Sequence, residues 1–277
     1  MDAAEQLIEA LQRIEQLNEE LSQTNQGVVA LYSELDIKAE ELRKATELKS
    51  KFLSYISHEF RTPLGAIVSL SRLLLGHTDG PLSAEQEKQI NFVKSSAEEL
   101  TEMVDDLLDL AKIEAGRLSV SPGWFEMVDL FAALRGMFGP LLQSEHVALV
   151  FEEPEGFPRV FTDDRKLSQI LRNFVSNALK FTQHGEVRVT ARREGDMAVF
   201  CVSDTGIGIS PAHIPALFQD FIQIDAPIQK RLRGSGLGLS LSKRLAQLLG
   251  GDVDATSELG KGSVFRVWIP FVIPAQN

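Results

Sequence analysis

Apolar residues recur at a strict spacing of seven along residues 1–47. The repeated positions are Leu7, Ile14, Leu21, Val28, Leu35 and Leu42. This repeat is typical of a coiled coil, in which each helix buries a narrow apolar seam against a partner. The second seam follows either a set that begins at Ala10 and Leu17 or an offset set with Asn18 and Asn25, so the register stays open. We expect a two-chain coiled coil; one amphipathic helix packed on its own protein is the alternative.

From residue 48 to residue 117 the apolar stripe widens and follows helical spacing. Its first half holds Phe52, Ile56, Phe60, Leu64, Ile67 and Leu74. Its second half holds Val93, Ala97, Leu100, Val104, Leu107 and Ala111. Residues 76–83 interrupt it, with Ser83 placed to cap the second helix and Gly116 placed to end it. Because a helical hairpin cannot bury so wide a stripe alone, we expect two chains to form a four-helix bundle in a homodimer.

The pattern changes to mixed helix and strand over residues 118–277. Short β-rich runs lie at 146–152, 185–192, 197–204, 252–256 and 263–272. Helical patterns lie at 128–143, 164–182 and 236–250. This order predicts an α/β sandwich with helices on one face of a mixed sheet. The fold class expected for the chain is therefore α + α/β, with a coiled coil at 1–47, a helical hairpin at 48–117 and the sandwich at 118–277.

Composition and charge narrow the function classes. The chain has 277 residues and a net charge of −11, and residues 1–47 alone hold 11 acidic and 4 basic side chains. Neither part carries the basic stripe that a nucleic-acid binder needs, so we expect no DNA or RNA partner. No run approaches about 18 apolar residues and the first residues lack a signal-peptide pattern, which predicts no membrane segment and a cytoplasmic location. Cys201, the only cysteine, is expected to fill a strand.

A small polar group stands out in the first helix of the hairpin. His58 lies two residues from the apolar positions on either side, about 200° around the helix from each, and should face solvent. Thr62 follows at i+4 on the same face, and Glu59 is adjacent in sequence. Pro63 cannot donate to the Glu59 carbonyl, so we expect the helix to be loosened there. A plain surface histidine is the alternative to a nucleophilic imidazole whose proton passes to a neighbouring carboxylate.

The sandwich region contains three pieces suited to a nucleotide, in place of a P-loop string. Asn173, Asn177 and Lys180 share one helix face; amide oxygens suit Mg²⁺ and a lysine can meet phosphates. Asp204 follows a strand and can accept from the adenine amine, with Gly206 and Gly208 allowing close approach. A small-residue loop before a helix can present N–H groups to phosphate: Gly234, Ser235, Gly236, Leu237 and Gly238. Each piece alone also reads as ordinary helix surface or a turn.

Two sets of motifs resemble a known family. The string FLSYISHEFRTPLGAI at 52–67 resembles the H-box of sensor histidine kinases. The three C-terminal pieces, in this order, resemble the N, G1 and G2 boxes of the GHKL ATPase fold. LFQDFIQID at 217–225 is similar to the F box, with Phe218 in it, and 225–233 then corresponds to an ATP lid with Arg231. The resemblance covers about residues 48–272.

The resemblance implies roles for individual residues. His58 would be the phosphoacceptor, Glu59 the residue that polarises its ring, and Thr62 the residue that orients water in the reverse phosphatase reaction. Asn177 would be the principal Mg²⁺ ligand, supported by Asn173 and Lys180. The remaining contacts to ATP would come from Asp204, which reads adenine, and from Gly206, Gly208, Phe218, Arg231, Gly234, Ser235, Gly236, Leu237 and Gly238.

The implied function is a homodimeric, ATP- and Mg²⁺-dependent protein histidine kinase. It would phosphorylate His58 and pass the phosphoryl group to an aspartate in the receiver domain of a response regulator. One alternative is another GHKL ATPase of the chaperone, topoisomerase or serine-kinase kind, which has no use for the H-box. A second is a scaffold that binds ATP and a partner without phosphotransfer. Residues 24–36 resemble linkers that follow an upstream domain, so we expect a fragment of a longer kinase or a kinase whose partner does the sensing.

Overall fold

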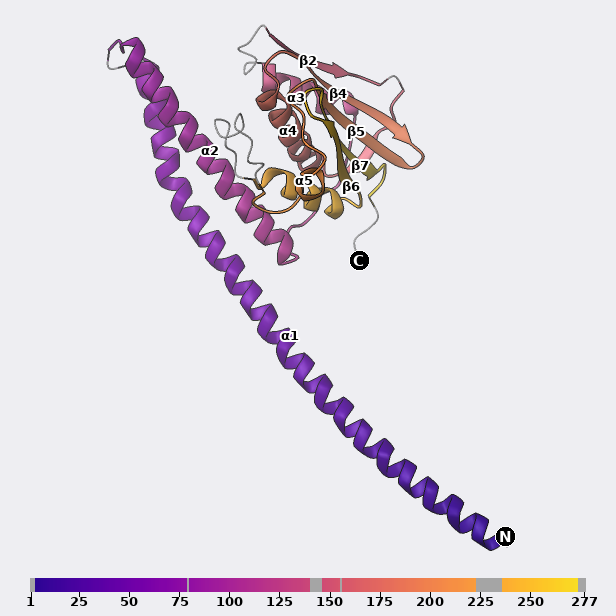
Figure 1. Cartoon of the computed structure of the whole chain (residues 1–277). Helices are drawn as coiled ribbons and strands as arrows, with labels where there is room; N and C mark the ends of the chain where they lie inside the picture. Colours follow the sequence, from indigo (N-terminus) through magenta and orange to yellow (C-terminus); the bar gives the residue numbers. More distant parts are fainter. Residues whose placement is uncertain (1–2, 79, 140–145, 155, 223–235, 274–277) are drawn as a thin grey trace. The chain divides into compact units, whose positions relative to one another are not determined.

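The computed structural model describes residues 3–78, 80–139, 146–154, 156–222 and 236–273 (Figure 1). The chain divides into two compact units, residues 1–52 and residues 53–277. Helix α1 (Ala3–Leu75) begins in the first unit and ends in the second. Among the described residues, no helix is long and apolar enough to cross a membrane.

From Ala3 on, the first unit is one uninterrupted stretch of α1. Its surface carries ion pairs one turn apart, among them Arg43 with Glu40 at 2.8 Å and with Glu47 at 2.7 Å, which support a solvated helix by a few tenths of a kcal/mol each. The repeated apolar positions lie on its exposed surface, and Leu42 is 69% exposed. The helix expected from the heptad pattern is confirmed, while its pairing with a second chain stays a prediction.

The second unit opens with the helical hairpin formed by the C-terminal part of α1 and by α2 (Ala84–Glu114). Ser83 caps α2 as expected: its side chain accepts from the Gln86 N–H, and the Gln86 side chain accepts in return from the Ser83 N–H. This reciprocal pair is a capping box. At the other end, Gly116 has φ of +64° and donates to Ile113, while Arg117 donates to Lys112. These two bonds form a Schellman motif, which ends the helix where the glycine predicted.

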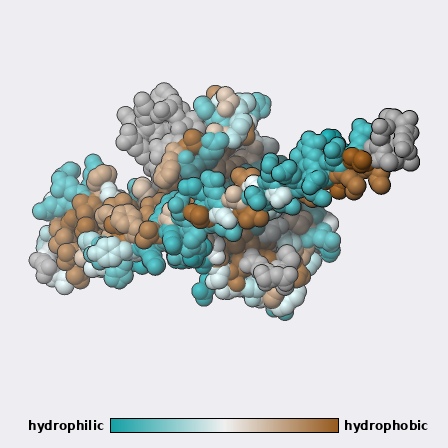
Figure 2. Space-filling model, turned by 90° about the horizontal axis from the view of Figure 1, so that it is seen from below, coloured by the Kyte–Doolittle hydropathy of each residue, from teal (hydrophilic) through white to brown (hydrophobic). Residues whose placement is uncertain are grey.

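Only part of the hairpin's apolar stripe is buried within one chain. Leu64, Ala97 and Ala111 are buried, and Arg61 on α1 pairs with Asp105 on α2 at 2.6 Å. Much of the remaining stripe is exposed: Phe52, Phe60, Ile67, Leu74, Val93 and Leu100. Apolar surface of this kind appears brown in Figure 2. An exposed stripe along both helices is what the expected four-helix bundle needs, and that bundle stays a prediction.

The rest of the unit is a layer of helices on a mixed sheet. The sheet has the order β2-β4-β5-β7-β6, and only the β2–β4 pair is parallel. The strands are β2 (Val147–Glu152), β4 (Gly185–Glu194), β5 (Met197–Asp204), β6 (Asp252–Glu258) and β7 (Gly262–Pro270). The helices are α3 (Met127–Phe138), α4 (Asp164–Phe181) and α5 (Gly238–Leu248), and Figure 1 shows them on one side of the sheet. The expected one-sided sandwich is confirmed.

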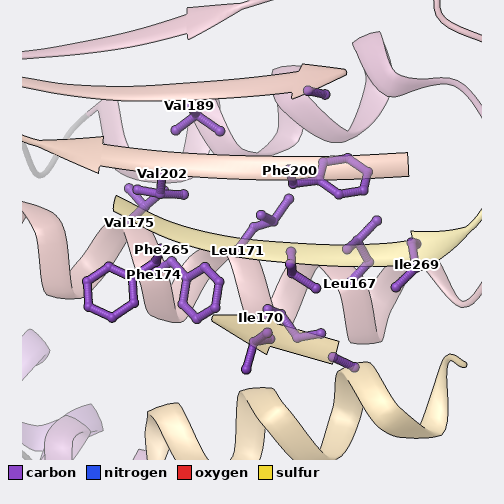
Figure 3. Packing of buried hydrophobic residues seen from close by; sticks show 14 of the residues in the cluster. Leu167, Ile170, Leu171, Phe174, Val175, Val189, Phe200, Val202, Phe265 and Ile269 are labelled. Carbon is purple, nitrogen blue, oxygen red and sulfur yellow. The ribbon is translucent and has the colours of Figure 1, made fainter. Parts of the chain in front are cut away.

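One core joins the helices to the sheet (Figure 3). Alternate residues of β5, including Phe200 and Val202, face it, as the two-residue period of a strand requires. Helix α4 contributes residues spaced three and four apart, of which Leu167 and Phe174 are fully buried. Cys201 is buried in β5, and burial raises the pKa of its thiol. It fills the strand as expected.

A second, two-stranded sheet was missed by the sequence pattern. Strand β1 (Gly123–Phe125) pairs with β3 (Val160–Thr162), and Phe161 also exchanges backbone hydrogen bonds with Phe271 and Ile273. Runs of three residues carry too little alternation to be recognised. A single-turn 3-10 helix, η2 (Ile214–Ala216), was missed for the same reason. Helix α3 ends at Phe138, and residues 140–143 of the helix expected there lie outside the described residues.

Candidate functional site

His58 lies on the exposed surface of α1. Its side chain is 79% exposed, and its Nδ1 atom lies 4.0 Å from Oε1 of Glu59. The hydroxyl of Thr62 donates to the His58 carbonyl at 3.4 Å. The helix continues through Pro63, so the loosening expected there does not interrupt it. An exposed imidazole beside a carboxylate can reach a phosphoryl donor.

The residues of the N box lie half-buried on α4. Nδ2 of Asn177 donates to Oδ1 of Asn173 at 3.2 Å, and Nδ2 of Asn173 donates to Oγ of Ser242 on α5 at 2.8 Å. Because the two ends of an amide point in different directions, this bond turns the oxygen of Asn177 away from Asn173. The side-chain oxygen of Asn177 is neutral and hard, and such an oxygen suits Mg²⁺.

Lys180 lies one turn beyond Asn177 on the same helix. Burial lowers the pKa of its ammonium group, and the negative charge of Glu99 opposes that change. Its Nζ atom also lies 5.8 Å from the centre of the Phe181 ring. A partly desolvated ammonium group interacts more strongly with a phosphate than a fully hydrated one does.

Asp204 ends strand β5 and is buried. Burial raises the pKa of its carboxyl, while hydrogen bonds from the backbone N–H groups of Gly206 and Ser263 lower it. The Gly206 bond joins N to Oδ1 over 2.8 Å. These donors orient the carboxyl at the edge of the sheet, where its remaining acceptor capacity can read the amine of an adenine ring.

Glycine is required at this edge because backbones meet there. A Cβ on Gly206 would lie 2.4 Å from the carbonyl oxygen of Phe181 at the end of α4. Gly208 and Gly236 have positive φ angles of 67° and 71°, in the region that side chains disfavour. Gly206 and Gly208 are therefore required by contacts within the protein, and the close approach to adenine expected of them stays a prediction.

The G2 segment meets the N box directly. A Cβ on Gly238 would lie 2.4 Å from Oδ1 of Asn173, so helix α5 begins in contact with that amide. Leu237, the buried N-cap residue of α5, has no polar side chain to accept from the first N–H groups of the helix. A helix N-terminus of this kind favours an anion. Arg231, Gly234 and Ser235 lie outside the described residues.

Phe218 is half-buried and packs against the core. The ammonium of Lys243 lies 5.9 Å from the centre of its ring. Two residues further on, Asp220 accepts from Arg244 at 2.7 Å, and the same guanidinium donates to Glu114 at the end of α2 at 3.3 Å. Arg244 therefore joins helix α5 both to the hairpin and to the segment that carries Phe218.

Three residues that contribute to this geometry were missed by the sequence reasoning. Ser242 accepts from Asn173, Ser263 donates to Asp204, and a Cβ on Gly262 would lie 1.9 Å from the Asp204 carbonyl oxygen. The string GKGS at 260–263 was the available signal for the last two, since it marks a tight turn before β7. A serine inside a helix gives no comparable signal.

Comparisons with known proteins agree with this geometry. Residues 48–116 match the His Kinase A (phospho-acceptor) domain. Residues 162–273 match the family of histidine kinase-, DNA gyrase B- and HSP90-like ATPases. The chain therefore belongs to the sensor histidine kinases.

Individual relatives extend the likeness across both regions. The circadian input-output histidine kinase CikA of Synechococcus elongatus is 40% identical over 229 residues, which cover 82% of this chain and 30% of CikA. The crystal structure of full-length ShkA in complex with AMPPNP has 31% identity and a TM-score of 0.66, and covers 82% of this chain and 47% of that one.

A further structure shares the fold alone. The complex of histidine kinase ThkA with response regulator protein TrrA has 20% identity and a TM-score of 0.56, and covers 82% of this chain and 63% of that one. This chain spans less than half of the length of the curated relatives it matches.

Proposed function

We propose that the chain is an ATP-dependent protein histidine kinase that phosphorylates His58. The observation that carries the proposal is the contact between Gly238 and Asn173, which brings the N-terminus of α5 to the linked amides of Asn173 and Asn177 on α4. The buried carboxyl of Asp204 lies at the end of the neighbouring strand β5, where it can hold the base. The AMPPNP complex of ShkA supports a nucleotide at the corresponding region of this chain.

The chemistry assigned to the H-box is a single phosphoryl transfer. A neutral nitrogen of His58 attacks the γ-phosphorus of ATP, an N–P bond forms, and the bond to the ADP oxygen breaks. Glu59 takes the proton that leaves the other ring nitrogen. The exposure of His58 allows a bound nucleotide to approach in line with the ring.

The residues of the sandwich hold the donor. Asn177 offers its amide oxygen to Mg²⁺, which neutralises phosphate charge when bound. Lys180 adds a second positive charge, and the N-terminus of α5 offers backbone N–H groups to the phosphates. This donor set fits a nucleotide-bound Mg²⁺, because such an ion takes only one or two protein ligands and completes its shell with phosphate and water.

The acceptor of the second step is proposed to be an aspartate in a response-regulator receiver domain. The ThkA–TrrA complex, in which a histidine kinase of the same fold binds a response regulator, supports this partner class. Thr62, one turn beyond His58, is proposed to orient water in the reverse phosphatase reaction. The exposed stripe of the hairpin supports a homodimer. Because ATP is the phosphoryl donor, we assign the reaction to the cytoplasm.

Labelling with γ-labelled ATP and Mg²⁺ tests the proposal. We expect label that is labile in acid and stable in alkali, and we expect His58→Gln and Asn177→Ala each to remove it. His77→Gln is the matched control, because His77 is an exposed histidine of the same hairpin, and it should keep the label. Label that is stable in acid would favour a serine-kinase relative. ATP binding without any label in the wild-type chain would favour the scaffold alternative.

A further inference from the structure

We infer that Ser242 is a positioning residue for the magnesium site. Ser242 lies on α5, is only 2% exposed, and touches neither substrate nor metal in the proposed chemistry. Its hydroxyl holds the side-chain amide of Asn173 in place, and Asn173 in turn positions the amide of Asn177. The inference rests on the proposed function, because Asn177 is the metal ligand only within that proposal.

The two hydrogen bonds of the Asn173 amide run in a defined direction. Oγ of Ser242 accepts from Nδ2 of Asn173 at 2.8 Å, which leaves Oδ1 of Asn173 to accept from Nδ2 of Asn177 at 3.2 Å. An amide has one donating and one accepting end, so the orientation of the first amide determines the orientation of the second. In this arrangement the oxygen of Asn177 is the end available to a cation.

The side chain of Asn173 is closely packed against α5. Gly238 and Ser242 are four residues apart, so they lie on the same face of α5. The backbone at Gly238 leaves no room for a Cβ beside Oδ1 of Asn173, and the Ser242 hydroxyl meets the other end of the same amide. Helix α5 therefore holds the Asn173 amide with two successive turns.

The consequence concerns metal affinity. Ser242→Ala removes the partner of the Asn173 Nδ2 group, so the side-chain amide of Asn173 is less firmly held. If that amide turned by 180°, its NH₂ group would face Asn177, and the Asn177 amide would have to turn as well to accept from it. The NH₂ group of Asn177 would then point towards the cation, and a donor group cannot ligate a metal. Groups behind a metal ligand commonly change metal affinity by 10-fold or more when removed.

The test measures Mg²⁺ binding without turnover. A fluorescent trinitrophenyl analogue of ATP is bound to the purified chain while Mg²⁺ is titrated from a chelated start. We expect Ser242→Ala to raise the Mg²⁺ concentration at half-saturation by about 10-fold or more, with unchanged binding of the analogue in chelator. Ser242→Thr, which keeps the hydroxyl, should restore the wild-type value.

Ser240→Ala is the matched control. Ser240 is on the same helix and equally buried, but its hydroxyl donates to the Leu237 carbonyl of its own helix at 2.9 Å. It should keep the wild-type Mg²⁺ dependence. A wild-type value for Ser242→Ala, or the same shift in Ser240→Ala, would overturn the inference. Asn177→Ala distinguishes a failure of this inference from a failure of the proposed function. If Asn177→Ala leaves the Mg²⁺ dependence unchanged, Asn177 is not the metal ligand and the proposed function fails at that point too.

Discussion

The backbone N–H of Gly206 donates to Oδ1 of Asp204, two residues earlier, over 2.8 Å. The same glycine lies so close to the end of α4 that a Cβ would come within 2.4 Å of the Phe181 carbonyl oxygen. Gly206 therefore orients the carboxyl that is proposed to bind adenine, and it also packs directly against the end of α4.

Gly206→Ala should damage both roles. The added methyl group forces the Phe181 backbone to move, and overpacking of this kind costs about 1–3 kcal/mol. We expect a lower free energy of unfolding by that amount in denaturant titrations, together with weaker binding of ATP.

Gly136→Ala is the control for this change. Gly136 lies in α3, and a Cβ there meets nothing within 4 Å. Alanine should stabilise that helix by about 0.5–1 kcal/mol. If Gly206→Ala matched the wild-type chain in stability and in ATP affinity, the close contact between Gly206 and the Phe181 carbonyl would be contradicted.

Asp106 on α2 predicts a pH dependence. Burial raises the pKa of its carboxyl to about 6, repulsion from Glu102 and Asp109 adds to the rise, and Arg172 on α4 opposes it. The ordinary pKa of this carboxyl, which holds in the unfolded chain, is 3.8. Because the pKa is higher in the folded chain, folding favours the protonated form of Asp106. The stability contributed by protonated Asp106 is complete below about pH 4 and is lost as the pH rises through about 6.

Asp106→Asn should consequently stabilise the fold at pH 7.5 by about 1–2 kcal/mol, since it removes the cost of a half-buried charge. The gain should shrink as the pH is lowered from 7 to 4.5. Asp105→Asn is the comparison, because Asp105 pairs with Arg61 at 2.6 Å on the exposed side of the hairpin; it should leave stability unchanged or lower it by up to about 1 kcal/mol. If Asp106→Asn raised the free energy of unfolding by the same amount at pH 4.5 and at pH 7.5, the raised pKa of Asp106 would be contradicted.

The apolar seam of the first unit predicts how two chains associate. The double substitution Leu21→Asp, Leu35→Asp places charges in the seam, and burial of each leucine contributes about 1.5–3 kcal/mol. We expect the dissociation constant of the dimer to rise by about 100-fold or more in sedimentation experiments.

Ile8→Asp, Ile37→Asp is the matched double substitution. Both isoleucines are exposed on the same helix and lie outside the seven-residue series. It adds the same charge and should change the dissociation constant by less than about 3-fold, as expected for exposed positions. If the two double variants dissociate alike, the seam is not the dimer contact.

The sequence was most informative where a pattern is repeated. The continuous apolar run around Phe200 and the helical spacing from Leu167 to Ala178 are long enough to identify β5 and α4. The Ser83 capping box and the Gly116 terminus have local chemical causes, so they too could be predicted.

The remaining features depend on contacts between distant segments. Ser242 meets Asn173 across 69 positions, and nothing in the residues around Ser242 indicates that partner. The three residues of β3 form a strand because β1 and the end of the chain pair with them. The requirement for glycine at 262 comes from the Asp204 carbonyl on a different strand. These requirements come from segments that meet only when the chain is folded, so the local sequence does not indicate them.

The position of the phosphoryl group decides whether His58 is the residue that the chain phosphorylates. The chain is incubated with ATP and Mg²⁺, digested under alkaline conditions, and the peptide that spans residues 52–61 is fragmented by electron transfer in a mass spectrometer. We expect the phosphoryl group on His58, and none on the adjacent Ser57, which is buried. A phosphoryl group found on a serine or threonine, with His58 unmodified, would contradict this expectation.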